Sequence, residues 1–185
     1  VPSAVRLNDV LVSGDRLTIA GDDGALFFSA NFTNLTANPL VLAPFNGGDV
    51  LGLATTPTTN QVCAVGERAL LHKAIGTARL PVIDLFPPAM QDVSFNPAGE
   101  GYAAGSGRTL RHTLDGGLTW DLVPVLEPTY TAVNLRAVCL DGSGKALVGG
   151  QATGGNNYYL RRITGNTIAA PNVDVPALAS NDVVN

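Results

Sequence analysis

The sequence predicts an all-β fold, a β-propeller of four-stranded blades. Two sequence features, here called landmarks, recur together at a spacing of about 40 to 45 residues, and no helical periodicity is present. The first landmark is a short run centred on an apolar residue, at Val10, Leu53, Val93, Val138 and Val183, in steps of 43, 40, 45 and 45 residues. The second is an apolar strand ending in glycine, 11 to 13 residues later, at Gly21, Gly66, Gly105 and Gly150. The units consist of short apolar runs separated by turn residues, which indicates strands.

The third unit shows its strands most clearly. Its apolar runs cover residues 92–95, 101–104, 109–113 and 119–124, separated by turns at 96–99, 106–107 and 114–117. Four antiparallel strands in about forty residues are typical of a propeller blade. A β-sandwich or a β-solenoid is the alternative, but a sandwich needs no repeat and solenoid coils are usually shorter.

We therefore expect one propeller domain, or part of one, over residues 1–185. Its blades are expected at about 5–46, 47–89, 90–128 and 129–176, with a further blade beginning at 177–185. Four blades are few for a propeller. Both ends of the chain also supply the same strand of the repeat, so we favour a fragment of a larger ring, or a ring completed by another chain.

The composition restricts the classes of binding partner and the cellular compartment that we expect. Hydrophobic residues make up 45% of the chain, charged residues 14%, and the net charge is −4, which argues against nucleic-acid and anionic-membrane surfaces. No apolar run approaches the ~20 residues of a membrane-spanning helix. Two lysines against nine arginines, and a first residue other than Met, favour a mature extracytoplasmic protein or an arbitrary boundary. We expect Cys63 and Cys139 to be small buried residues rather than a disulfide pair.

One turn in the third unit has its own local chemistry, Thr113-Leu-Asp-Gly-Gly-Leu-Thr-Trp120. Asp115 can accept hydrogen bonds from backbone N–H groups of its own turn, and the Thr113 hydroxyl can add another. Gly117 can adopt a positive φ, and Trp120 can pack between neighbouring blades.

This turn resembles the Asp-box (BNR) motif, carried here by Thr113, Asp115, Gly117, Thr119 and Trp120. With residues 93–105 it looks like a blade of the photosystem II assembly/stability-factor type, with similar blades in sialidase-like and sortilin-like propellers. The resemblance implies a structural turn between the third and fourth strands on the outer rim. It covers residues 90–124; the first unit keeps a degenerate turn at 29–33, and the second and fourth units have none.

The sequence predicts no catalytic, cofactor or metal residues. A sialidase needs an arginine triad, a Tyr nucleophile with a Glu partner and an acid; arginines occur at 68, 108, 111, 161 and 162, but acids near strand ends are sparse. A xyloglucanase-like enzyme needs two carboxylates across a cleft. The best set is Asp22, Asp23 and Glu67, yet Gly-Asp-Asp-Gly is an ordinary turn. Calcium-loop spacing is absent, and His72 and His112 lack a third metal ligand.

Loops after the second strands are the predicted contact surface, because propellers usually bind partners there. The candidate residues are Asp22, Asp23, Glu67, Arg68, Arg108, Gln151, Asn156, Asn157 and Tyr158. We expect a non-enzymatic extracytoplasmic scaffold whose partner is a protein, further blades, an envelope surface or a glycan. The alternative is a secreted glycosidase, sialidase-like or xyloglucanase-like, whose catalytic residues lie outside this segment.

Overall fold

A computed structural model describes residues 5–29, 40–41, 48–56, 61–67, 70–74, 82–84, 88–125, 133–152 and 157–168. Their strands form four antiparallel sheets of four strands, each in chain order. Sheet 1 contains β1 (Leu7–Ser13), β2 (Arg16–Gly21), β3 (Ala25–Ser29) and β4 (Leu40–Val41), with a 3₁₀ turn η1 (Asp22–Gly24). Sheet 2 contains β5 (Val50–Thr56), β6 (Gln61–Gly66), β7 (Leu70–Ala74) and β8 (Val82–Asp84).

The other two sheets repeat this order. Sheet 3 contains β9 (Met90–Phe95), β10 (Gly101–Gly105), β11 (Leu110–Thr113) and β12 (Asp121–Leu122). Sheet 4 contains β13 (Val133–Leu140), β14 (Lys145–Ala152), β15 (Asn157–Thr164) and β16 (Thr167–Ile168). No described helix is long and apolar enough to cross a membrane.

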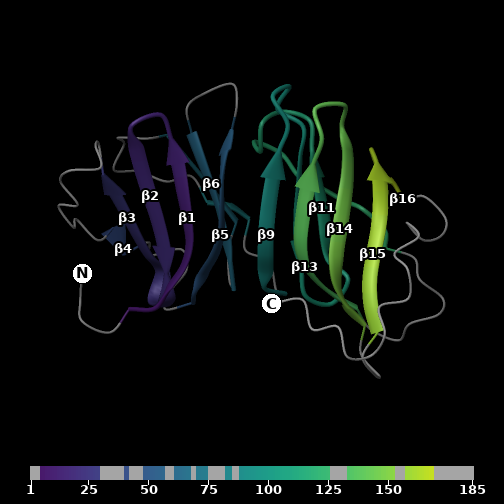
Figure 1. The fold of residues 1–185 in the computed structure, drawn as a ribbon, viewed down its shortest axis with the longest axis horizontal. Coiled ribbons are helices and arrows are strands. Elements are labelled where there is room, and N and C mark those ends of the chain that lie inside the picture. The colour runs from purple at the N-terminus through teal and green to yellow at the C-terminus, as the bar shows by residue number, and fades with distance from the viewer. Residues whose placement is uncertain are drawn as a thin grey trace.

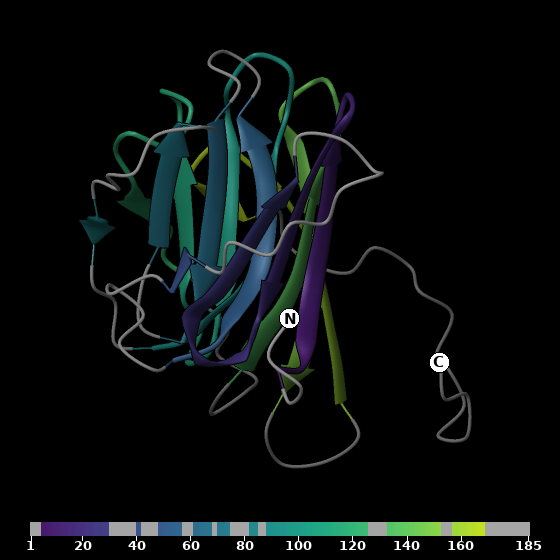
Figure 2. The same cartoon turned by 90° about the vertical axis from the view of Figure 1, so that its left-hand side faces the viewer.

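The first strand of each sheet packs on the sheet before it. β5 contacts β1 and β2, β9 contacts β5 and β6, and β13 contacts β9 and β10. The sheets therefore follow one another side by side in chain order, as Figure 1 shows and as the turned view of Figure 2 repeats. This arrangement confirms the predicted propeller architecture.

Three apolar clusters lie between consecutive sheets and hold them together. The cluster between sheets 1 and 2 includes Leu26 and Leu53, that between sheets 2 and 3 includes Cys63 and Val93, and that between sheets 3 and 4 includes Val138. The first-landmark residues of sheets 2 to 4 are thus buried against the preceding sheet. Val10 of sheet 1 is 60% exposed, because no described sheet precedes it.

The second landmark has a steric cause. A Cβ atom on Gly21 would lie 2.6 Å from the carbonyl oxygen of Arg6, and one on Gly105 would lie 2.6 Å from that of Ala89. Both carbonyls belong to the residue four before the first landmark of the same sheet. The end of the second strand therefore crosses the entry to the first strand too closely for any side chain.

The expectation that Cys139 is buried is wrong. Cys63 is buried and Cys139 is exposed, and both are free thiols. Burial raises the pKa of the Cys63 thiol. Cys139 is exposed because its side of β13 faces away from sheet 3, onto the open face of sheet 4.

Candidate functional site

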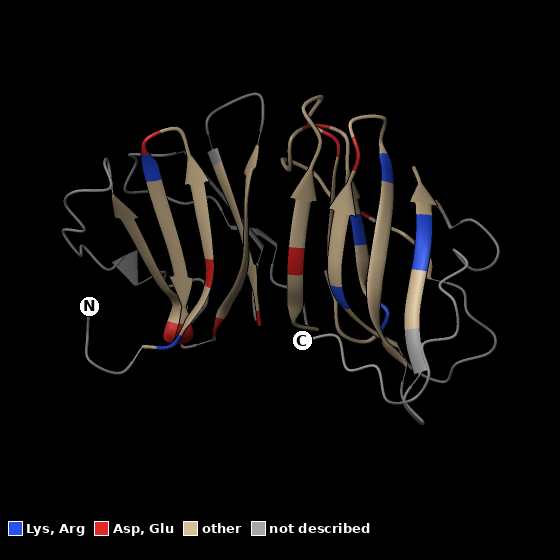
Figure 3. Ribbon diagram, in the orientation of Figure 1, with Lys and Arg blue, Asp and Glu red and all other residues tan. Residues whose placement is uncertain are grey.

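The connections from second to third strands lie at one end of the molecule, here called the second-turn end. The first strands run upward in Figure 1, so the antiparallel second strands finish at the bottom. Acidic residues gather there below sheets 1 and 2 (Figure 3). The end therefore carries polar groups from several sheets.

Asp49 links the acidic residues of sheets 1 and 2. Its Oδ1 accepts a hydrogen bond from the Asp23 N–H at 3.1 Å, and its own N–H donates to Glu67 Oε2 at 3.4 Å. The Glu67 N–H returns a bond to the Asp49 carbonyl at 3.0 Å. Asp22 Oδ1 accepts from Asn8 Nδ2 at 3.0 Å. Three of the predicted contact residues are therefore held in one group.

The same clamp recurs between sheets 3 and 4. Asn134 Oδ1 accepts a hydrogen bond from the Gly107 N–H at 3.1 Å, as Asp49 accepts from Asp23. The two turns share a backbone feature, because Asp23 (φ 56°) and Arg108 (φ 65°) both adopt a positive φ. Such a conformation is costly for residues other than Gly, so the clamped neighbouring sheet supports it.

The other candidates are placed as follows. Arg108 is partly buried in the β10–β11 turn, and Gln151 is exposed near the end of β14. Asn157 and Tyr158 begin β15, and their side chains are not described. Arg68 and Asn156 lie outside the described residues.

Sequence reasoning missed Asp49 and Asn134. Both stand four residues before the first landmark of their sheets, at Leu53 and Val138, on the entry from the preceding sheet. Aligning the four repeat units at this position, where a side chain with an acceptor oxygen occurs in the second and fourth units, could have identified both residues from the sequence.

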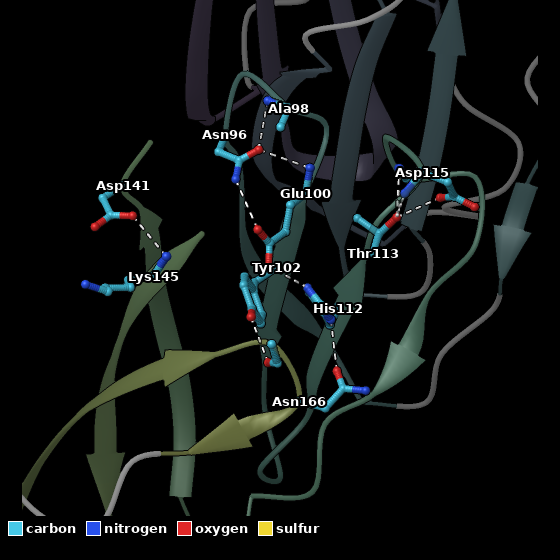
Figure 4. A network of polar contacts seen from close by, with 12 residues as sticks. Asn96, Ala98, Glu100, Tyr102, His112, Thr113, Asp115, Asp141, Lys145 and Asn166 are labelled. Carbon is cyan, nitrogen blue, oxygen red and sulfur yellow. Dashed lines mark hydrogen bonds and ion pairs between the residues drawn. The ribbon is translucent and has the colours of Figure 1, made fainter. Parts of the chain in front are cut away.

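The turn that resembles an Asp box joins β11 to β12 and is closed by Asp115 (Figure 4). Asp115 Oδ1 accepts from the N–H groups of Leu118 and Thr119, each at 2.9 Å, and from Thr113 Oγ1 at 2.8 Å. Its Oδ2 accepts from Thr119 Oγ1 at 2.6 Å. Partial burial raises the pKa of Asp115, but these bonds outweigh it and lower the pKa to about 2.

Trp120 closes the same turn from its apolar side. Its Nε1 donates to the Gly117 carbonyl at 3.0 Å, and its ring meets Phe95 edge-on at 5.8 Å. Both rings pack against the cluster between sheets 2 and 3. Gly117 has a φ of 92°, and a Cβ there would lie 3.2 Å from Phe95 Cζ, a tight contact. These contacts stabilise the fold around the turn.

A partly buried polar network joins sheets 3 and 4 (Figure 4). His112 is 5% exposed; its Nε2 lies 3.0 Å from Glu100 Oε1 and its Nδ1 2.9 Å from Asn166 Oδ1. Tyr102 stacks on this imidazole at 4.4 Å and donates its hydroxyl to the Gly165 carbonyl at 2.7 Å. Burial raises the pKa of Tyr102 to about 12, and the Glu100 charge adds to the rise.

Two aspartates bond from one first strand to the next. Asp9 Oδ2 accepts the Leu53 N–H at 2.7 Å, and Asp92 Oδ2 accepts the Val138 N–H at 2.8 Å. Burial raises the pKa of Asp92, opposed by its backbone hydrogen bonds. Within the described ranges, no three His, Cys, Asp or Glu side chains are grouped to hold a metal ion.

Neither the family models nor the curated proteins contain a match to this chain. Solved structures do match it. YCF48 from Cyanidioschyzon merolae superposes with a TM-score of 0.61 at 16% identity, over 85% of this chain and 50% of that one. YCF48 bound to a D1 peptide gives 0.60 at 17%, over 88% of this chain and 55% of that one. The fold is a β-propeller.

Two further propellers are similar in the same way. A nidogen/laminin complex gives a TM-score of 0.55 at 12% identity, over 78% of this chain and 60% of that one. An ancestral GH74 enzyme gives 0.58 at 15%, over 84% and 25%. The chain thus spans between a quarter and three fifths of the length of these structures, and at such identities the likeness concerns the fold alone.

Proposed function

We propose that this chain is a non-enzymatic, extracytoplasmic β-propeller scaffold that binds a protein partner at its second-turn end. The observation that carries the proposal is the clamped group Asp22, Asp23, Asp49 and Glu67. Its bonds hold the side chains of Asp22, Asp49 and Glu67 and the backbone of Asp23 in fixed positions at that end. Pre-organised polar groups lose little conformational entropy on binding.

The similar structures support a protein as the partner. The YCF48 structure contains a D1 peptide, and the nidogen structure is a complex with laminin. Both proteins have the fold of this chain and were solved with protein or peptide ligands. A fold alone does not fix a function, so the site itself has to be tested.

The charges at the second-turn end indicate which charges the partner's surface should carry. The acidic residues of sheets 1 and 2 favour a basic surface patch there, whereas Arg108 favours an acidic or amide-rich group beside sheet 3. Electrostatic complementarity of this kind mainly sets the association rate and the specificity. The partner should bind less tightly as salt rises.

A pair of matched charge reversals tests this interface. Cross-linking in envelope extracts identifies a partner, whose affinity for the purified chain is then titrated. Glu67→Lys should weaken binding about tenfold by opposing a basic patch. Asp15→Lys changes the charge equally in the exposed β1–β2 turn, at the opposite end, and should leave affinity unchanged. Equal effects of both variants would contradict an interface at the second-turn end.

Fractionation of producing cells tests the compartment, and recovery of the chain in the cytoplasm alone would contradict an extracytoplasmic role.

The alternative function is that of a glycosidase, and the similarity to the GH74 enzyme is the observation that favours it. Release of sugar from sialosides or xyloglucan by the wild-type protein would replace the scaffold with a glycosidase.

A further inference from the structure

Each sheet carries one row of directly opposed residues on its first three strands. In sheets 1 to 3 the first two residues of the row lie on the side toward the next sheet. The rows are Leu11–Thr18–Phe28, Ala54–Cys63–His72, Ser94–Tyr102–His112 and Cys139–Leu147–Arg162. These residues occupy equivalent positions, because each row begins one residue after the first landmark.

The rows differ in burial. The central residues Thr18, Cys63 and Tyr102 are 4%, 0% and 0% exposed, whereas Leu147 in sheet 4 is 37% exposed. Its row neighbours Cys139 and Arg162 are also exposed. A hollow of about 480 Å³ lies over this face, lined chiefly by β13 and β14. In sheets 1 to 3 the equivalent face is covered by the next sheet, whereas in sheet 4 it is exposed.

In sheets 1 to 3 the same kind of element covers the row. Leu53, Val93 and Val138 are first-landmark residues, and each is buried in the cluster that it shares with the preceding sheet. The covering element is therefore a first strand, which lies across the first and second strands of the sheet before it.

We propose that residues 181–185 of this chain, which lie outside the described part, dock as such a first strand on the β13–β14 face. Their sequence Asn181-Asp-Val-Val repeats Asn8-Asp-Val-Leu11, and Val183 follows Val138 by 45 residues, the step that separates Val93 from Val138. This inference does not depend on the proposed function.

The length of the connection fits. From the end of a fourth strand to the next first landmark the chain takes 12 residues (41 to 53), 9 (84 to 93) and 16 (122 to 138). From Ile168 to Val183 it takes 15. Ala137 stands at the repeat position of Asp9 and Asp92, whose larger side chains fit there and bond to the next first strand. A small side chain at this position therefore leaves room for a following strand.

Alkylation of Cys139 in the full chain measures the docking. In the docked state Val183 covers the row that contains Cys139, so the thiol should react with iodoacetamide slowly. Val183→Asp places a charge in this apolar contact and should raise the Cys139 rate at least about tenfold. Val10→Asp is the matched control: it changes the same repeat position on the exposed side of sheet 1 and should leave Cys139 protected.

Three outcomes would overturn the proposal. One is a Cys139 rate in the wild type equal to that in Val183→Asp. Another is protection that depends on protein concentration together with a dimer mass by light scattering, which would assign the face to a second copy. The third is faster reaction of Cys63 along with Cys139, since the buried Cys63 reports the fold and should stay unreactive in both variants.

A disulfide tests the register without a disruptive substitution. Ser94 Oγ accepts the Leu140 N–H at 3.3 Å, so a row residue faces the position two after the next landmark. By the same register Cys139 faces Asn185. Asn185→Cys should form an intramolecular disulfide with Cys139 under mild oxidation, whereas Asp15→Cys should not. Absence of the first crosslink, or equal yields of both, would refute this docking.

Discussion

At the scale of single residues, carboxylates bound to backbone N–H groups recur and differ in their surroundings. Asp115 closes its own exposed turn, whereas Asp92 reaches from sheet 3 to sheet 4 in a partly buried position. Burial raises the pKa of both carboxyls, but the hydrogen bonds of Asp115 together outweigh it, so the pKa of Asp115 is lowered and that of Asp92 is raised. Similar hydrogen bonds therefore give opposite dependences of stability on pH.

Asp115 should make stability fall in acid. Because its folded-state pKa is depressed to about 2, the carboxylate stabilises the fold above about pH 4, and this contribution disappears as the pH falls through 2. Denaturant unfolding between pH 5 and 2 should show a steeper loss of unfolding free energy in the wild type than in Asp115→Asn. Parallel pH profiles would contradict the assignment.

Asp92 should tolerate an amide better than an alanine. Asp92→Ala leaves the Val138 N–H without its acceptor and should lower the unfolding free energy by roughly 1–3 kcal/mol. Asp92→Asn keeps one oxygen, which can still accept the Val138 N–H, and removes the cost of burying a charge, but its amide nitrogen leaves the Val93 N–H without an acceptor. It should therefore lose less than Asp92→Ala, which removes both acceptors. The raised pKa also means that the wild type gains stability as Asp92 is protonated, a pH dependence absent from Asp92→Asn.

At the scale of elements, equivalent hairpin turns use the same device. Asn96 Oδ1 accepts from the N–H groups of Ala98 and Glu100, and Asp141 Oδ1 accepts from those of Ser143 and Lys145. The two turns join the first and second strands of sheets 3 and 4. Their difference lies in what surrounds them, since the Glu100 carboxylate lies directly against Gly144.

Two glycines in the β13–β14 turn should respond differently to the same substitution. Gly144 has a φ of 80° and a Cβ there would collide with the Glu100 carboxylate, so Gly144→Ala should lower the unfolding free energy by roughly 1–3 kcal/mol. Gly142→Ala is the control, because a Cβ at Gly142 meets nothing within 4 Å. Chemical denaturation of both variants checks this; equal losses would place the strain elsewhere.

At the scale of the whole molecule, stability comes from the contact of each sheet with the next. A blade buries its faces only on its neighbours, so equivalent residues differ in burial according to their place in the series. Val138 is 5% exposed against sheet 3, whereas Val10 at the same repeat position is 60% exposed. The energetic weight of a position is therefore set by the presence of a neighbouring sheet.

Val138→Ala should lower the unfolding free energy by roughly 1.5–3 kcal/mol, the value of a buried apolar side chain, while Val10→Ala should change it by less than about 0.5 kcal/mol. Thermal or denaturant unfolding of the two variants measures the difference. Similar losses at both positions would mean that something covers the face of sheet 1 in solution.

The sequence by itself determined the repeat, the strand order within each sheet and the glycine in each second strand, because these depend on local periodicity and on contacts within one unit. Only the tertiary structure decided which repeat positions are buried and how Asp49 and Asn134 clamp the preceding turn. It also decided that Cys139 lies on an exposed face. These features arise between units: the same residue in the same strand is core or surface according to whether another sheet packs against it.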